Sequence, residues 1–311
     1  MTTSRPNRLR RSELSTPGTS PKMIAKAAAS DADLVFLDLE DAVAPNAKVG
    51  ARANIIAGLN DLDWGTKVRA YRVNGVHTQW CHDDIIEVVT GAGPNIDVII
   101  VPKVKSPRDV WFVDDLLTQL ESKLGLETGR IGLELLIEET EALACVEQIA
   151  AASPRLEALI LGIGDLSASQ GVRASHVGVA DEGEVGAYPG DIWHFARTRM
   201  IVAARANGID AIDGPYAHFA NPEGYRRDAS WVATLGGVGK WCIHPSQIAI
   251  ANEVFAPTEA EIKTATEIVT AVQEAEAQGL GAANYNGIMV DAATTRVFET
   301  TLERARLCGL L

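Results

Sequence analysis

The sequence has few cysteines, no long apolar run and a deficit of positive charge. Its four cysteines among 311 residues lie far apart and form no CxxC pair, so neither a zinc site nor a disulfide framework is predicted. This usage is typical of a reducing compartment, and we expect a cytoplasmic protein. No stretch approaches the ~20 apolar residues of a membrane span, and the basic start of the chain lacks the apolar segment of a signal peptide.

Acidic residues outnumber basic ones, 41 against 28, which gives a net charge of -13. Such a balance opposes binding to a nucleic-acid backbone or to an anionic membrane surface, so we expect neither as a partner. It does not exclude a small anionic substrate, because a local site can still be cationic. The composition, 47% hydrophobic and 22% charged, suits a globular chain with a sizeable core.

Short apolar runs recur along the chain, each followed by loop residues and then a helical pattern. Runs without strict alternation are typical of parallel strands buried on both faces. Strand–helix units repeated in this way predict an α/β fold, a (β/α)8 TIM barrel, with a doubly wound open sheet as the alternative. Segment 171–194 is predicted to be a long irregular loop. The predicted strands cover residues 12–16, 34–39, 68–73, 97–102, 131–137, 158–163, 208–213 and 239–244.

The chain continues beyond the last predicted strand. Helical patterns cover residues 258–278 and about 291–308, and a barrel has no position for them. We therefore divide the chain into a barrel domain, residues 1–256, and a C-terminal helical extension, residues 257–311.

Carboxylates gather where predicted strands end, which in a TIM barrel is the catalytic face. Asp38, Glu40 and Asp41 follow the second strand, Glu138 the fifth and Asp165 the sixth. A buried carboxylate is costly without a cation or hydrogen-bond donors. Oxygen ligands without clustered His or Cys favour Mg²⁺ or Mn²⁺ over zinc. We predict a metal on the fifth-strand and sixth-strand acids, whereas Glu40 and Asp41 could alternatively cap the following helix.

Two cations also lie at predicted strand ends. Arg72 ends the third strand, and its burial requires an acidic partner or an anionic ligand, so it is a candidate catalytic residue. A structural partner among Asp38, Glu40 and Asp41 is compatible with this role. Lys103 follows the fourth strand and could form a Schiff base, but a salt bridge to a strand-end acid is favoured.

Nine segments of the sequence, taken in order, resemble the citrate lyase β-subunit-like (HpcH/HpaI aldolase) family of Mg²⁺-dependent carbon–carbon lyases. Within that family the chain looks most like the malyl-CoA/β-methylmalyl-CoA lyases. Each segment is weak by itself, but their joint order over nearly the whole chain is specific. They are STPGTSP (15–21), DLEDAVAP (38–45), YRVNG (71–75), IIVPKV (99–104), LIEETEAL (136–143), GIGDLSASQG (162–171), IDGPYAHFANPEGY (212–225), GKWCIHPSQIAIANEVFAPT (239–258) and GIMVDAA (287–293).

The resemblance implies a TIM barrel with a C-terminal lid, assembled as trimers or hexamers. It maps the Mg²⁺ ligands to Glu138 and Asp165, and the arginine that contacts the oxo acid and thioester to Arg72. A lid aspartate that serves a neighbouring subunit maps to Asp291, which makes residues 257–311 a lid and oligomerisation segment. Coenzyme A contacts map to Ser15, Ser20, Lys26, Gly164, Ile243 and His244.

The expected reaction is the Mg²⁺-dependent, reversible aldol-type cleavage of L-malyl-CoA or β-methylmalyl-CoA. Its products would be glyoxylate and acetyl-CoA or propionyl-CoA, and Mn²⁺ could replace Mg²⁺. Enzyme alternatives are a citramalyl-CoA lyase, which releases pyruvate, and a malyl-CoA thioesterase. The alternative outside enzymes is a CoA-binding scaffold subunit.

Overall fold

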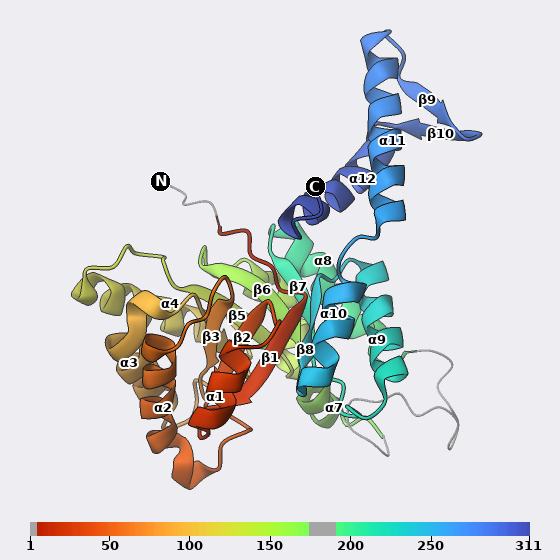
Figure 1. Ribbon diagram of the computed structural model, residues 1–311. Helices are drawn as coiled ribbons and strands as arrows, with labels where there is room; N and C mark the ends of the chain where they lie inside the picture. The colour runs from red at the N-terminus through yellow and green to blue at the C-terminus, as the bar shows by residue number, and fades with distance from the viewer. Residues whose placement is uncertain (1–4, 174–190) are drawn as a thin grey trace. The chain divides into compact units, whose positions relative to one another are not determined.

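The computed structural model describes residues 5–173 and 191–311. Eight parallel strands form a closed barrel in chain order, and β8 pairs with β1 to complete it (Figure 1). The TIM-barrel prediction is confirmed, and the open-sheet alternative is wrong. The strands are β1 (Ser12–Pro17), β2 (Leu34–Asp38), β3 (Val68–Arg72), β4 (Val98–Val101), β5 (Gly132–Ile137), β6 (Leu156–Leu161), β7 (Asp210–Asp213) and β8 (Gly239–Cys242).

Helices connect successive strands, as the right-handed βαβ crossover requires. Several carry sequence signals at their ends: Ser20 caps α1, Ser106 and Asp109 form a capping box at α4, and Gly125 ends α4 in the left-handed conformation. The helices of this part of the chain are α1 (Pro21–Ala28), α2 (Lys48–Asp61), α3 (Cys81–Ala92), α4 (Pro107–Leu124), α5 (Thr140–Ala144), α6 (Val146–Ala150), α7 (Ile163–Gln170), α8 (His194–Ala206), α9 (Pro222–Leu235) and α10 (Ile248–Val254).

The barrel interior is apolar in the middle and charged near its N-terminal end. Apolar side chains from seven of the strands, together with Val238 before β8, form one buried cluster, in which Phe36 and Trp241 have ring centroids 4.5 Å apart. Below it, Arg10 is buried and forms ion pairs with Glu134, Glu157 and Asp210. Ion pairs at this end serve stability rather than catalysis, because TIM-barrel active sites lie at the opposite face.

The chain divides into two compact units. The first contains Arg10–Asn252 with the first residues, and the second contains Asn7–Leu9 with Glu253–Leu311. The expected domain division at residue 256 remains a proposal. Among the described residues, no helix is long and apolar enough to cross a membrane. The predicted loop 171–194 falls largely on residues 174–190, which lie outside the described part. All four cysteines are free thiols.

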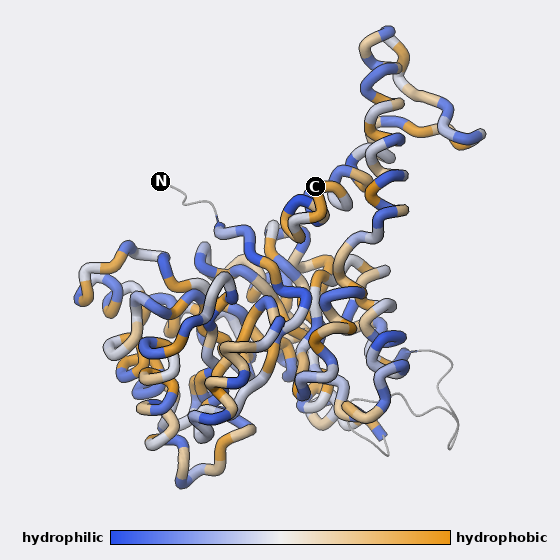
Figure 2. The backbone as a smooth tube through the Cα atoms, viewed as in Figure 1, coloured by the Kyte–Doolittle hydropathy of each residue, from blue (hydrophilic) through white to orange (hydrophobic). Residues whose placement is uncertain are grey.

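The second unit is a helical hairpin with a small sheet inserted. The predicted helices are present as α11 (Glu259–Ala277) and α12 (Ala292–Leu307), and hydrophilic and hydrophobic residues are interspersed along α11 (Figure 2). Their apolar faces pack through Ala265, Val269 and Leu302. Between them lies an antiparallel pair that we did not predict, β9 (Ala282–Tyr285) and β10 (Ile288–Asp291).

Candidate active site

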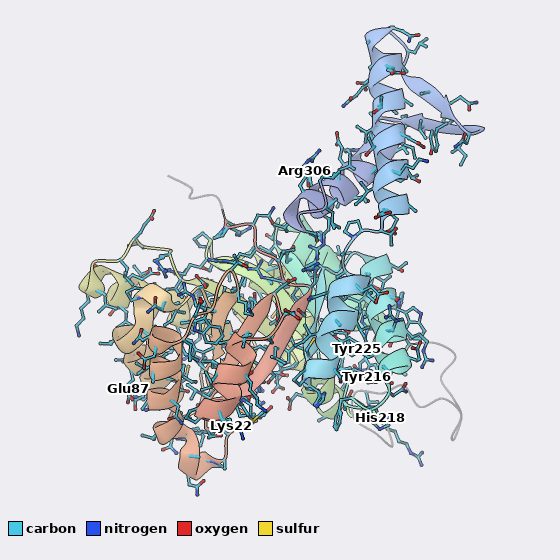
Figure 3. All side chains as sticks on the ribbon, in the orientation of Figure 1. Lys22, Glu87, Tyr216, His218, Tyr225 and Arg306 are labelled. Atoms are coloured by element: carbon cyan, nitrogen blue, oxygen red, sulfur yellow. The ribbon has the colours of Figure 1, made fainter. Side chains whose placement is uncertain are left out.

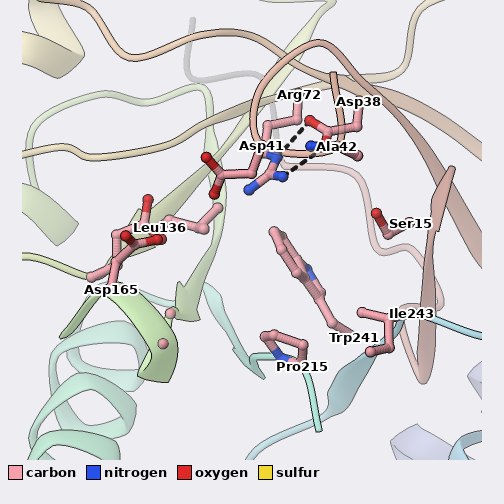
Figure 4. Close-up of a pocket in the computed structure, with 13 residues that line it drawn as sticks. Ser15, Asp38, Asp41, Ala42, Arg72, Leu136, Asp165, Pro215, Trp241 and Ile243 are labelled. Carbon is pink, nitrogen blue, oxygen red and sulfur yellow. Dashed lines mark hydrogen bonds and ion pairs between the residues drawn. The ribbon is translucent and has the colours of Figure 1, made fainter. Parts of the chain in front are cut away.

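A pocket of about 310 Å³ opens at the C-terminal ends of the barrel strands (Figure 4). It contains both predicted metal ligands, the predicted catalytic arginine and two of the supporting acids. Since the C-terminal ends of all eight strands meet at one face of a barrel, residues far apart in sequence converge there. The lining residues are Ser15, Asp38, Asp41, Ala42, Arg72, Leu136, Glu138, Gly162, Gly164, Asp165, Pro215, Trp241 and Ile243.

Arg72 is held by two buried carboxylates. Asp38 and Arg72 are register partners on adjacent strands, so their side chains meet: Nε and Nη2 donate to the two Asp38 oxygens at 2.8 and 2.7 Å. Nη1 lies 2.9 Å from Glu40 Oε2. Burial alone would raise the pKa of Asp38, but the charge and hydrogen bonds of Arg72 and the backbone N–H groups of Glu40 and Ala42 together outweigh it, and that pKa lies below its usual value. Both groups are therefore charged at neutral pH.

Arg72 also lines the pocket, and aromatic rings help to position its guanidinium there. Its guanidinium carbon lies 5.3 Å from the Trp241 ring centroid and 5.9 Å from that of Phe36, so two aromatic rings orient it. A guanidinium has five N–H groups, and the contacts with Asp38 and Glu40 use three of them. The remaining donors can bind an anionic oxygen in the pocket.

Glu138 lines the pocket and is 2% exposed. Burial raises its pKa to about 8, although the charges of Lys103 and Arg72 act in the opposite direction. Its Oε1 accepts a hydrogen bond from the backbone N–H of Lys103 at 2.7 Å. Gly162 leaves room for this carboxylate, since a Cβ atom at that position would lie 2.6 Å from Oε2. The neighbouring Glu139 begins α5 and does not line the pocket.

The donor set fits a divalent cation with oxygen ligands. Asp165, at the start of α7, has a side chain that is 42% exposed and lines the same pocket as Glu138. A cation beside Glu138 would supply the positive charge that favours its ionised form. Within the described residues, no group of three or more His, Cys, Asp or Glu side chains is placed to hold a metal. Two carboxylates, with water and substrate oxygens as the other ligands, would form a coordination sphere typical of Mg²⁺ in proteins.

Lys103 forms the salt bridge that we favoured over a Schiff base. Its Nζ lies 2.5 Å from Glu40 Oε1, 3.5 Å from Asp41 Oδ1 and 3.6 Å from Asp165 Oδ2. Partial burial would lower the pKa of this ammonium, but the hydrogen bond and charge of Glu40 raise it above its ordinary value. An amine that stays protonated is a poor nucleophile, which argues against covalent catalysis here.

The helix-capping alternative for Glu40 and Asp41 is wrong. The first helical turn after β2 is Pro45–Ala47, and neither it nor α2 uses these carboxylates as caps. Glu40 instead bridges Arg72 and Lys103. Asp41 has a side chain that is 60% exposed and lines the pocket.

The predicted coenzyme A residues fall into two groups. Ser15, Gly164 and Ile243 line the pocket, whereas Ser20, Lys26 and His244 do not. Ser20 caps α1 and Lys26 is exposed on the same helix. His244 is exposed, and its ring centroid lies 5.0 Å from that of Phe219. Phe219 follows His218 in sequence, and Figure 3 labels His218 beside Tyr216. Because β1 and β8 are neighbours, the loops that follow them border the same side of the barrel mouth.

Asp291 belongs to the second unit and begins α12. Its Oδ1 accepts hydrogen bonds from the backbone N–H groups of Ala293 and Thr294, both at 3.0 Å, and from Thr294 Oγ1 at 3.1 Å. The hydrogen bond from the Thr294 backbone is the main reason why its pKa lies below the usual value. Its predicted catalytic role stays a prediction.

Sequence reasoning missed the apolar wall of the pocket and one buried lysine. Trp241 and Pro215 form this apolar wall. The only sequence signal for the wall was the position of Trp241 in a predicted strand. Lys48 donates to the carbonyl oxygens of Leu39 and Glu40 at 2.8 and 2.7 Å. It thereby fixes the loop that carries the acidic residues, and a single lysine in a helical pattern gives no signal of such a contact.

Comparison with known proteins points to one family. The family described as HpcH/HpaI aldolase/citrate lyase matches residues 11–245. An L-malyl-CoA/beta-methylmalyl-CoA lyase of Rhodobacter capsulatus is 43% identical over 307 residues, which cover 97% of this chain and 96% of that protein. A (3S)-malyl-CoA thioesterase of Cereibacter sphaeroides is 35% identical over 295 residues, covering 95% and 94%.

Solved structures share the architecture as well. The protein CitE from Mycobacterium tuberculosis, solved in complex with magnesium, acetoacetate and coenzyme A, is 28% identical with a TM-score of 0.73. The match covers 96% of this chain and 98% of that one. The likeness therefore extends over both units of the chain.

Proposed function

The chain belongs to the HpcH/HpaI aldolase/citrate lyase family, and from this premise we propose that it is a divalent-metal-dependent carbon–carbon lyase. Its substrate would be L-malyl-CoA or β-methylmalyl-CoA, cleaved reversibly to glyoxylate and acetyl-CoA or propionyl-CoA. The observation that carries the proposal is one pocket in which Glu138 and Asp165 stand beside the anchored Arg72. This chemistry has two requirements. Carboxylates must hold the divalent metal ion, and a fixed positive group such as a guanidinium must stabilise the enolate oxygen that develops.

The residues have separate tasks in the proposed mechanism. Glu138 and Asp165 would hold Mg²⁺, or Mn²⁺ in its place, and the ion would supply Lewis acidity for the oxo-acid carbonyl. Arg72 donates its remaining N–H groups to the oxygen of the thioester enolate, which forms when the carbon–carbon bond breaks. Asp38 and Glu40 keep this guanidinium oriented, so its reorganisation costs little during the reaction.

The lid and the assembly complete the proposal. Asp291 takes the proton from the acyl carbon in the synthetic direction and, by reversal, returns it to the enolate carbon in cleavage. It comes from a neighbouring subunit of a homo-oligomer, a trimer or hexamer. Residues 257–311 act as the lid and oligomerisation segment beside a barrel domain of residues 1–256. Coenzyme A lies along the loops after β1 and β8, where Ser15, Ser20, Lys26, Gly164, Ile243 and His244 are the proposed contacts. The cytoplasm is the proposed compartment, with neither nucleic acid nor membrane as a partner.

A panel of CoA thioesters tests the proposed function. The purified protein is incubated with Mg²⁺ and malyl-CoA, β-methylmalyl-CoA or citramalyl-CoA, and product masses are measured. Glyoxylate with acetyl-CoA or propionyl-CoA is expected. Free CoA with malate would identify the thioesterase activity for which a relative is named, and pyruvate would identify a citramalyl-CoA lyase. No turnover on any thioester would favour a CoA-binding scaffold.

The mutation Arg72→Lys tests the role of the arginine fork. A lysine keeps the charge but cannot bind Asp38 through two parallel hydrogen bonds while also facing the pocket. We expect kcat to fall by about 10-fold or more, measured as acetyl-CoA release. Arg69→Lys is the matched control, because Arg69 lies on the same strand and pairs with Asp97 outside the pocket. Equal kinetics in both variants would make Arg72 a structural residue.

A further inference from the structure

Lys103 has an unusual backbone conformation. Its φ is 53°, and in the described part of the chain only Asn286 shares a positive φ among residues other than glycine. Asn286 lies in a hairpin turn, where asparagine tolerates this region. A lysine has no such tolerance, and backbone strain of this kind persists where the surroundings enforce it, commonly at functional sites.

This conformation lets one residue contact four carboxylates. The backbone N–H of Lys103 points to Glu138 and donates at 2.7 Å. The side chain contacts three further acids: Nζ lies 2.5 Å from Glu40, 3.5 Å from Asp41 and 3.6 Å from Asp165. The residue therefore links the candidate metal ligands to the acidic loop after β2.

The ammonium lies nearer to Glu40 than to Asp41 or to the proposed metal ligand Asp165. Glu40 binds both Lys103 and Arg72, so its two oxygens already have cationic partners. Asp41 faces the same ammonium from the exposed side. As they stand, no three acids of the described residues are placed to hold a metal. Because Glu40, Asp41 and Asp165 all approach the same ammonium, its removal would free Glu40 and Asp41 to turn toward a cation held by Asp165 and Glu138.

We propose that Lys103 limits the divalent cation to the carboxylates of Glu138 and Asp165 by occupying Glu40 and Asp41 with its ammonium. The inference rests on the metal site of the proposed function. It has two consequences: coordination positions stay open for water and substrate oxygens, and Mg²⁺ is favoured over Ca²⁺. Mg²⁺ typically takes one or two carboxylates and retains water, whereas Ca²⁺ takes six to eight oxygen ligands in flexible geometry.

The test measures metal binding in the absence of substrate. Mn²⁺ is titrated into the purified full chain by electron paramagnetic resonance, Ca²⁺ is added as a competitor, and water-proton relaxation counts the waters on bound Mn²⁺. Lys103→Met should bind Mn²⁺ about tenfold more tightly, because a competing unit charge is gone. It should gain more affinity for Ca²⁺ than for Mn²⁺, and its bound Mn²⁺ should carry fewer exchangeable waters.

Two further variants make the result specific. Lys105→Met removes the same charge two residues away, where the ammonium lies 3.2 Å from the exposed Glu141, and it should bind metal like the unmodified protein. Lys103→Gly removes the ammonium and accommodates the positive φ without strain, so it should reproduce Lys103→Met even if that variant folds poorly.

Each remaining outcome overturns the inference. Unchanged or weaker Mn²⁺ binding in both Lys103 variants would mean that the lysine does not restrict the site. Tighter binding with unchanged water count and unchanged Ca²⁺ preference would mean that only its charge acts, not the number of ligands. If the unmodified protein binds no Mn²⁺ at all, the proposed metal site fails together with the inference; if it binds Mn²⁺ and the variants match it, the inference alone fails.

Discussion

Chelation of the divalent cation should abolish turnover, and Mg²⁺ or Mn²⁺ should restore it. Asp165→Asn should have a comparable effect, because it keeps the shape of the side chain but removes the charge that holds a hard cation. The side chain is 42% exposed and makes only a 3.6 Å contact with Lys103, so the fold should tolerate the change. Mn²⁺ affinity should fall by more than the roughly 10- to 100-fold that replacing an outer-shell partner costs.

Asp41→Asn is the matched control for this prediction. Asp41 lines the same pocket, is 60% exposed and lies 3.5 Å from the same lysine, yet we do not assign it to the metal. It should retain Mn²⁺ binding and most of the activity. Equal losses in both variants would show that the pocket needs negative charge in general. Full activity in excess chelator, or borohydride trapping of substrate on Lys103, would replace the metal mechanism with another.

The barrel could be predicted because its signal is repeated. Eight buried apolar runs such as Leu34–Asp38 each end in loop or polar residues, and only a few architectures accommodate that order. Closure of the barrel then brings the strand ends together without further information. For this reason Arg72, Glu138 and Asp165 could be assigned to one site before their distances were known.

The pairing of the charges could not be predicted. Asp38 binds Arg72 because the two are register partners, and register depends on the whole barrel. Glu40 faces Lys103 across 63 positions of sequence, and the left-handed backbone of that lysine has no signal in the motif IIVPKV. Charge at strand ends could be read from the sequence, whereas the division of tasks among the acids depends on tertiary contacts.

The β9–β10 hairpin was missed although its signal was present. Asn286 and Gly287 have φ values of 51° and 83°, as a two-residue hairpin turn of the Asn-Gly type requires. The flanking strands are only four residues each, and their exposed residues Ile288 and Met289 do not alternate clearly. The turn dipeptide was therefore a better guide to this segment than its hydrophobic pattern.

The mutation Asp291→Asn should leave the fold, the assembly and Mg²⁺ binding intact but remove most of the cleavage activity. Asparagine caps helices as well as aspartate does, so the contacts with Ala293 and Thr294 can persist. The variant loses only the carboxylate that would transfer the proton at the acyl carbon. Glu303→Gln, which removes one charge from an exposed position of the same helix, should keep full activity.

Mixing variants tests whether the aspartate serves another subunit. Asp291→Asn chains have an intact barrel, and Asp165→Asn chains have an intact lid, so some mixed interfaces would combine the two. For equal, freely exchanging chains, about a quarter of the shared sites should be complete and active. Asp165→Asn suits this experiment better than removal of Arg72, which would leave the buried Asp38 carboxylate unpaired. No recovery after exchange has been verified by mass spectrometry would refute the shared site, and a fully active monomer would mean that the lid serves its own barrel.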